Sequence, residues 1–221
     1  MHAIIVRGES VRIDAPTRTW HEHGLKFDVP MRSTTRAVMN HWTGAENSPR
    51  AVFENLKRRT NVAGKVTPLS VQFVIDQMGE IWQLADTDAR CQHAGAIANG
   101  WSIGIEYICR GHNKTVPTRG IVREQRHETV HGRSLTYAAL TPEQIASGVE
   151  LNETLCRVYE LPLRVPMLKG EVYSTVLPAP LIASYQGVLG HFQVDLNKVD
   201  PALELLAAIH QRGLARQLPV A

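Results

Sequence analysis

The sequence predicts an α/β domain, and two kinds of signal lead to this. Short apolar segments with the alternation of β-strands recur through the first half of the chain, and three later segments carry capping or spacing patterns typical of helices. The chain has 221 residues, of which 43% are hydrophobic and 20% charged, enough to bury a substantial core. One large domain or two small ones would fit this length, and we expect a single domain over residues 1–221.

The chain begins with strand signals and continues into a helix. HAIIV and SVRIDA, separated by residues 7–9 with Gly8 in the turn, predict an N-terminal hairpin. AVMNHW (37–42) is a short apolar strand that runs into the polar turn TGAENS. Ser48 followed by Pro49 is a helix cap and first-turn pair, so we expect AVFENLKRR to be helical.

The middle of the chain predicts further strands. SVQFVID and EIWQLA, joined through Gly79, form the pattern of a β-hairpin. In SIGIEYI (102–108) the isoleucines alternate with Gly104 and Glu106, so Glu106 points away from the apolar face. A carboxylate in the middle of a strand is unusual and favours a functional role.

The second half predicts two helices and two long excursions. Thr141, Pro142 and Gln144 form a capping box, which predicts a helix to about Leu161. A last helix is expected over residues 202–213, ending in glycine. Residues 110–135, which are polar and rich in histidine, and residues 162–188, which are rich in proline, are interpreted as long loops.

Composition limits the classes of function. The formal net charge of +3 and sequence pI of about 8.9 are only mildly basic, and the charge is spread along the chain, so no nucleic-acid partner is predicted. The three cysteines (Cys91, Cys109 and Cys156) are widely spaced in apolar surroundings, which predicts free buried thiols. No apolar segment approaches the length of a membrane span, and the N-terminus lacks a signal-peptide pattern, so we expect synthesis in the cytoplasm without a signal peptide.

Three residues are candidates for a zinc site. Catalytic zinc takes histidine or carboxylate ligands and keeps a position open for water. Among ten histidines, His41 ends an apolar strand and His191 follows the apolar segment GVLG, with Asp200 nine residues later. Any one of these, taken alone, is more commonly a surface or hydrogen-bonded residue.

The order of the motifs resembles a known family. NHWTG, SVQFVIDQMGEIWQLA, QHAGAIANGWSIGIE, TPEQ and finally GH followed by KVDP occur in the order seen in the zinc-dependent N-acetylmuramoyl-L-alanine amidases. This family includes phage amidase lysozymes, bacterial muropeptide amidases and animal peptidoglycan recognition proteins. The resemblance covers residues 37–213, with 110–135 and 162–188 as insertions, and it implies a central mixed β-sheet flanked by helices.

The resemblance also implies roles for individual residues. It makes His41, His191 and Asp200 the ligands of a Zn²⁺ cofactor, Lys198 a stabiliser of the oxyanion, and Glu106 the general base of the muropeptide amidase branch. Chemistry agrees, because zinc lowers the pKa of bound water to about 7 and a nearby carboxylate can accept its proton.

Other positions are less defined. His93, Asn99 and Trp42 match positions that line the family's substrate cleft, although His93 and Asn99 fit a locally hydrogen-bonded turn equally well. Val71 and Gln72 occupy a region where many members of the family carry an aromatic residue or histidine. Because neither is present here, Glu106 is expected to be the main catalytic residue. We interpret His112, His127 and His131 as surface residues rather than a second metal site.

Two functions follow from the resemblance, and a third, the same fold acting on another amide or as a protein partner, has no specific support in the sequence. The first is hydrolysis of the amide between the lactyl group of N-acetylmuramic acid and L-alanine of the peptidoglycan stem peptide. The second is a recognition module that binds peptidoglycan without cutting it, which the complete ligand set disfavours. The substrate would be intact wall or soluble muropeptides, met in cytoplasmic recycling or reached through a holin or a secretion machine. The oligomeric state is left open.

Overall fold

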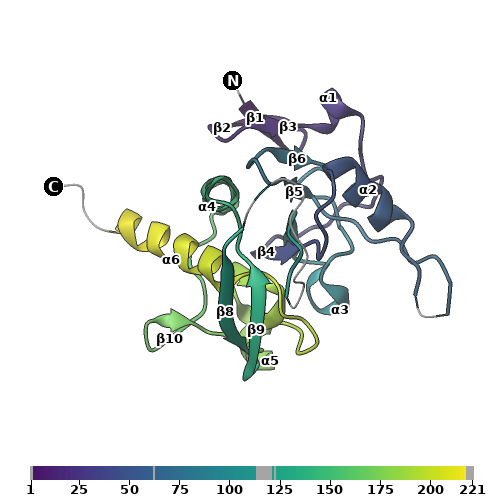
Figure 1. Cartoon of the computed structure of the whole chain (residues 1–221). Helices are drawn as coiled ribbons and strands as arrows, with labels where there is room; N and C mark the ends of the chain where they lie inside the picture. Colours follow the sequence, from purple (N-terminus) through teal and green to yellow (C-terminus); the bar gives the residue numbers. More distant parts are fainter. Residues whose placement is uncertain (1, 62, 113–120, 122, 218–221) are drawn as a thin grey trace.

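A computed structural model describes residues 2–61, 63–112, 121 and 123–217 (Figure 1). Its centre is a six-stranded sheet in the order β12-β4-β7-β5-β6-β3. Only the β5–β6 pair is antiparallel, so the sheet is mixed. The strands are β3 (Thr17–Arg18), β4 (Ala37–Trp42), β5 (Phe73–Ile75), β6 (Ile81–Gln83), β7 (Ser102–Tyr107) and β12 (Gly187–Gly190).

In the part of the chain that the structure describes, three two-stranded hairpins lie outside this sheet. The N-terminal hairpin is confirmed, with the left-handed Gly8 in its turn. The other two lie inside the stretches that the sequence interpreted as long loops. The hairpins are β1 (His2–Val6) with β2 (Glu9–Ile13), β8 (Gln125–Val130) with β9 (Arg133–Ala138), and β10 (Met167–Leu168) with β11 (Glu171–Val172).

The helices begin where the capping signals predict. The Ser48 side chain accepts a hydrogen bond from the Ala51 amide, and Thr141 and Gln144 form the expected capping box. The longer capped helix ends at Val158, slightly earlier than expected. The helices are α1 (Trp20–His23), α2 (Pro49–Lys57), α3 (Gly95–Ala98), α4 (Pro142–Val158), α5 (Ala179–Ser184), the single 3₁₀ turn η1 (His191–Gln193) and α6 (Leu203–Gln217).

The sheet is covered on both faces, which explains why its strands are mostly apolar. On one face, Ile103 and Ile105 of β7 belong to a buried cluster with Leu151 of α4 and Leu206 of α6. On the other face, one cluster joins β5 to α2 and another joins Ala37 and Met39 of β4 to α3 and α5. The three cysteines are free and buried, as predicted.

Strand register decides where the site forms. Strands β12, β4 and β7 are adjacent and parallel, so their carboxyl ends meet at one edge of the sheet. His41 pairs with Glu106 across β4 and β7, and Leu189 pairs with Met39 across β12 and β4. Because side chains alternate along a strand, His41, Glu106 and His191 all emerge on the same face of the sheet.

Two expectations from the sequence are wrong. Helix α6 does not end at Gly213 but continues to Gln217. A Cβ at position 213 would overlap the carbonyl oxygen of Leu163, so this glycine permits close packing rather than ending the helix.

The two predicted loops are also not loops throughout. Residues 125–138 form the β8–β9 hairpin, in which Val130, Leu135 and Tyr137 are buried against the main core. The second stretch contains β10, β11 and α5, and its end enters β12 at Gly187. Residues 113–120 and 122, within the first stretch, lie outside the described residues. In these segments, charged residues and prolines obscured the alternation of apolar and polar residues that is typical of strands.

No helix in the part of the chain described here is both long and apolar enough to cross a membrane.

Candidate metal centre

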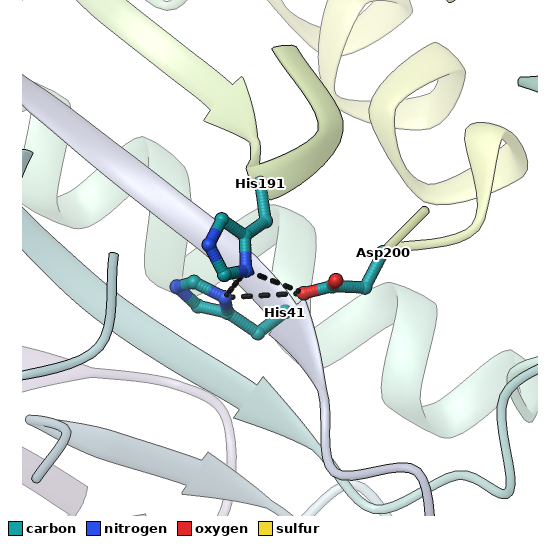
Figure 2. Close-up of side chains that lie close together, drawn as sticks. All are labelled: His41, His191 and Asp200. Atoms are coloured by element: carbon teal, nitrogen blue, oxygen red, sulfur yellow. Dashed lines mark hydrogen bonds and ion pairs between the residues drawn. The ribbon is translucent and has the colours of Figure 1, made fainter. Parts of the chain in front are cut away.

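The structure brings the three predicted zinc ligands together (Figure 2). The Nδ1 atoms of His41 and His191 are 3.0 Å apart, and Oδ2 of Asp200 lies 3.2 Å from the first and 3.1 Å from the second. His41 is the last residue but one of β4, His191 follows β12, and Asp200 comes from the segment leading into α6. All three residues are buried, so the triangle faces inward.

This triangle suits a cation better than a set of hydrogen bonds. Each neutral imidazole has one N–H, so two Nδ1 atoms facing one carboxylate oxygen cannot satisfy all three contacts with protons. Ligands about 2.0–2.1 Å from a tetrahedral zinc ion stand roughly 3.3 Å apart, close to the spacing found here. The buried His41, His191 and Asp200 group therefore fits a zinc site.

The electrostatics keep the group ready to bind a cation. Burial and the neighbouring His191 lower the pKa of His41 to about 4, so its imidazole is neutral at pH 7. Burial alone would raise the pKa of Asp200, but hydrogen bonds with His191 and His41 outweigh it and hold that pKa well below its usual range. Neutral imidazoles and an ionised carboxylate are the forms that bind metal.

His93 supports His41 from behind. Its Nδ1 lies 3.0 Å from Nε2 of His41, and its own Nε2 lies 3.4 Å from the carbonyl oxygen of Ser102. If Nδ1 of His41 binds a cation, Nε2 carries the proton and donates it to His93, which in turn donates to Ser102. The predicted position of His93 in the substrate cleft is compatible with this, since His93 also lines the cavity described next.

A cavity of about 350 Å³ opens over the triangle. Trp42, Glu106 and Lys198 line it together with the three metal-site residues, so seven of the eight predicted site residues, His93 included, share one cavity. The ring of Trp42 stacks on His112 at a centroid distance of 6.3 Å and tilts against Tyr137. Those contacts leave Trp42 half-buried, at the wall of the cavity.

Glu106 is the unusual group of this cavity. Its Oε2 atom is buried and has no hydrogen-bond partner among the residues the structure describes. Burial, reinforced by the charge of Asp200, raises the pKa of Glu106 to about 8, although Lys198 and Arg59 oppose the shift. A raised pKa and an unpaired oxygen are typical of a carboxyl group that exchanges protons with a ligand.

Asn99 lies away from the cavity and holds a turn. Its Oδ1 accepts hydrogen bonds from the amides of His93 at 2.9 Å and Ala94 at 2.7 Å, and its Nδ2 donates to Gln92 at 2.7 Å. These bonds use most of the hydrogen-bonding capacity of the Asn99 side chain. They fit the turn interpretation that the sequence left open, in which Asn99 acts by placing His93.

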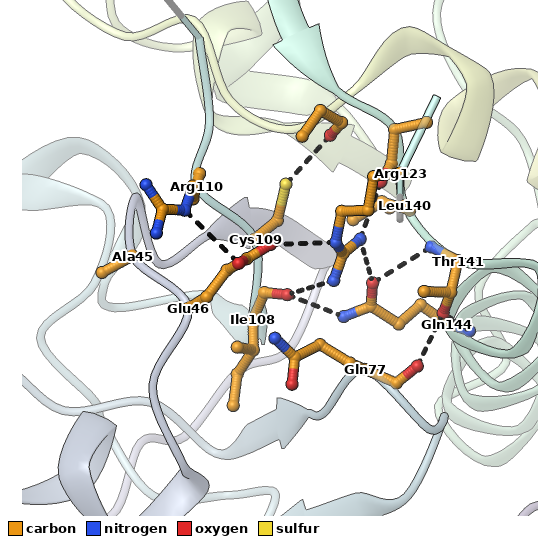
Figure 3. A network of polar contacts seen from close by, with 12 residues as sticks. Ala45, Glu46, Gln77, Ile108, Cys109, Arg110, Arg123, Leu140, Thr141 and Gln144 are labelled. Carbon is orange, nitrogen blue, oxygen red and sulfur yellow. Dashed lines mark hydrogen bonds and ion pairs between the residues drawn. The ribbon is translucent and has the colours of Figure 1, made fainter. Parts of the chain in front are cut away.

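A buried ion-pair network fixes the loop at the mouth of the cavity (Figure 3). Residues 43–45 and 47 line the cavity, and between them the Glu46 carboxylate turns inward, 3.0 Å from Nε of Arg123 and 3.3 Å from Nε of Arg110. Arg123 also donates to the carbonyl of Ile108 and to the side chain of Gln144 at the start of α4. The cavity loop is thus tied to β7 and α4.

Sequence reasoning missed several of these residues. Glu46, Arg123 and Arg59 look like ordinary surface charges, and only their burial or their place in the cavity distinguishes them. Asn40, next to His41, was a usable signal because a polar residue interrupts an apolar strand there. It is fully buried and exchanges two hydrogen bonds of 3.0 Å with Asn152 of α4.

The fold is that of peptidoglycan amidases and recognition proteins. Solved structures similar to this chain include the Staphylococcus aureus hydrolase AmiA in complex with its ligand, at 13% identity and TM-score 0.53, with 91% of this chain and 84% of that one covered. A selenomethionine derivative of AmpD matches at 16% identity and TM-score 0.51, covering 89% and 94%. Drosophila peptidoglycan recognition protein SD matches at 20% identity and TM-score 0.50, covering 93% and 96%. At these identities the likeness concerns the fold.

The family follows from the sequence itself. The model of the N-acetylmuramoyl-L-alanine amidase family matches residues 31–202, which is most of the chain. The chain therefore belongs to this family, the zinc-dependent type 2 amidases, as the resemblance indicated. No curated protein gives a significant match to it.

Proposed function

We propose that the protein is a zinc-dependent N-acetylmuramoyl-L-alanine amidase that cleaves the amide between the lactyl group of N-acetylmuramic acid and L-alanine of the stem peptide. The observation that carries the proposal is the buried triangle of His41, His191 and Asp200 beneath the same cavity that Glu106 lines. The family match to residues 31–202 supports the same reaction.

His41, His191 and Asp200 would hold the ion. A bound zinc ion supplies a Lewis acid that activates water and the scissile carbonyl. Its positive charge would also favour the ionised form of Glu106, offsetting the burial that raises the pKa of that carboxyl to about 8. Glu106 then has the protonation state of a general base near neutral pH.

Glu106 and Lys198 would divide the remaining chemistry. Glu106 accepts a proton from the attacking water and passes it to the leaving nitrogen as the carbon–nitrogen bond breaks. The ammonium group of Lys198 stabilises negative charge on the carbonyl oxygen, an effect of about 3 kcal/mol for one such donor. The products are the lactyl carboxylate and a stem peptide with a free amine on L-alanine.

The proposal is tested by mass spectrometry of products. Purified protein is incubated with intact sacculi and, separately, with soluble anhydro-muropeptides, each with chelator, without chelator and after zinc is restored. We expect free stem peptides whose release stops with chelator and resumes with zinc. The preferred substrate distinguishes a wall-lysing enzyme from a recycling one.

The opposite result would identify the second candidate function. If neither substrate releases peptide while the protein still co-sediments with sacculi, the protein is a recognition module and the amidase proposal is wrong. The filled triangle disfavours that outcome, because all three ligand positions carry metal-binding side chains.

A further inference from the structure

The β8–β9 hairpin touches the segment that carries Lys198 and Asp200. In Figure 1 the hairpin lies beside α6, and direct contacts confirm that the two pack together. The hairpin comes from the stretch that the sequence interpreted as a loop with surface histidines. Two of its residues, His131 and Glu128, bond to the segment on either side of Asp200.

His131 holds the segment before Asp200. Its Nε2 lies 2.8 Å from the carbonyl oxygen of Lys198, and its Nδ1 lies 3.0 Å from the hydroxyl of Thr175. Because a carbonyl oxygen only accepts, Nε2 carries the proton and Nδ1 accepts from Thr175. The backbone amide of His131 also donates to the carbonyl of Ser174 at 2.9 Å. The half-buried ring is therefore fixed at both nitrogens, which corrects the surface interpretation.

Glu128 holds the segment after Asp200. Its Oε2 accepts a hydrogen bond of 2.9 Å from the amide of Leu203, the first residue of α6. The first amides of a helix have no partner within the helix, so this carboxylate acts as a cap supplied by another element. The hydroxyl of Tyr137 on the opposite strand donates to Oε1 of Glu128 and fixes the carboxylate in turn.

Between these two anchors the segment is also held by packing, since Asp200, Pro201 and Ala202 are buried and Val199 packs against the main core. The amide of Lys198 donates to Asp195 within the same loop, and the carbonyl of Asp200 accepts from Phe192. Leu196 and Asn197, just before Lys198, are exposed, so packing holds the segment less firmly before Lys198 than after it. The side of the segment that carries Lys198 therefore depends more on neighbouring hydrogen bonds for its geometry.

We propose that His131 and Glu128 are positioning residues, and that the β8–β9 hairpin clamps the segment between Lys198 and Leu203 so that Lys198 and Asp200 face the metal centre together. The inference rests on the proposed function for the roles of Lys198 and Asp200. Neither His131 nor Glu128 lines the cavity over the metal triangle, so each acts through the residues it holds.

The test compares two histidines of one hairpin. The shorter side chain in His131→Asn cannot reach the carbonyl oxygen of Lys198. Asparagine also tolerates the left-handed backbone at this position, where φ is 54°. His131→Gln keeps an N–H donor of similar reach and should rescue. His127→Ala is the matched control, because exposed His127 bonds only to Thr136 within the hairpin in the described structure.

Four readouts separate positioning from a general effect on folding. They are amide hydrogen exchange of residues 192–203, zinc affinity by chelator competition, kcat and KM for stem-peptide release, and the melting temperature. For His131→Asn we expect faster exchange across residues 195–200, about tenfold weaker zinc binding and a similar fall in kcat, with KM unchanged. At saturating zinc, the loss in kcat should be smaller in a Lys198→Ala background, because the part that acts through the Lys198 ammonium group is then already absent.

Glu128→Gln provides an independent arm, since it weakens the cap at Leu203 without touching His131. It should speed exchange at Leu203 and Glu204 first. If His131→Asn and Glu128→Gln both match His127→Ala in exchange and zinc affinity, the clamp is refuted. A wild-type protein without amidase activity would refute the proposed function, while the exchange measurements would still decide this inference.

Discussion

Nδ1 of His93 lies 3.0 Å from Nε2 of His41, so a histidine outside the metal triangle determines which nitrogen of His41 is free to bind. Burial and the neighbouring His41 keep the pKa of His93 well below its usual value, so it stays a neutral acceptor. We expect His93→Ala to weaken zinc binding about tenfold to a hundredfold, the usual effect of losing such a partner. Chelator competition measures this, and unchanged affinity would contradict it.

Gly104 makes the space for that histidine. A Cβ at this position on β7 would lie 2.8 Å from the ring of His93. We expect Gly104→Ala to displace the ring and weaken zinc binding in the same direction as His93→Ala. Gly100→Ala is the control, since a Cβ there meets nothing within 4 Å. Equal zinc affinity in the two alanine variants would show that the ring adjusts without loss.

Glu106 should make the stability of the metal-free protein depend on pH. Burial and the charge of Asp200 raise its folded pKa from 4.5 to about 8, so the folded state holds this proton more tightly than the unfolded state. The resulting stability is complete below pH 4.5 and is lost as pH rises towards about 8. Glu106→Gln cannot ionise, so its melting temperature relative to wild type should increase from pH 5 to pH 8.

The control for this measurement is Glu9→Gln, which changes an exposed carboxylate on β2. Its melting temperature should follow wild type at every pH. If the Glu106→Gln difference is equally flat, burial does not raise the pKa of Glu106 in the metal-free protein.

Breaking the buried Glu46–Arg123 pair by removing one partner should strongly destabilise the fold near the cavity. Both side chains are almost fully buried, at 1% and 2% exposure, so removing the guanidinium leaves a buried carboxylate whose remaining ion-pair partner among the described residues is Arg110. We expect Arg123→Ala to lower the free energy of unfolding by about 3–5 kcal/mol. Urea unfolding measures the loss. Arg58→Ala, which breaks an exposed pair with Glu54, should cost under about 1 kcal/mol.

Substitution of a metal ligand should have a different effect from substitution of the proposed base: the first removes zinc and activity, the second removes activity alone. His41→Ala and Asp200→Ala each remove one corner of the triangle, so we expect both zinc and activity to be lost. Glu106→Ala leaves the triangle intact and should retain zinc while losing turnover. Elemental analysis together with stem-peptide release distinguishes the cases. An inactive His41→Ala protein with a full complement of zinc would overturn the ligand assignment.

Local sequence patterns were sufficient for elements whose determinants lie within a few residues. The capping box at Thr141 and Gln144, the proline after Ser48 and the glycine turn of the first hairpin all act locally, and each forms as predicted. The order of motifs also identified the family, because this order can be read along the sequence without knowing where each motif lies in the fold.

Patterns failed where long-range packing decides the outcome. Gly213 has the sequence signature of a helix end, yet contact with Leu163 makes it an interior residue of α6. The β8–β9 hairpin was hidden among charges because only one of its faces is buried, and its polar residues Glu128 and His131 are paired with partners far along the chain.

The sequence by itself determined the class of domain, the family and the residue types of the metal site, since these depend on local propensity and on motif order. Tertiary structure decided the rest. Only the register of β12, β4 and β7 brings His41, His191 and Glu106 onto one face of the sheet. Only folding removes Glu106 from water and sets His93 behind His41, because burial and hydrogen-bond geometry arise from segments distant in sequence.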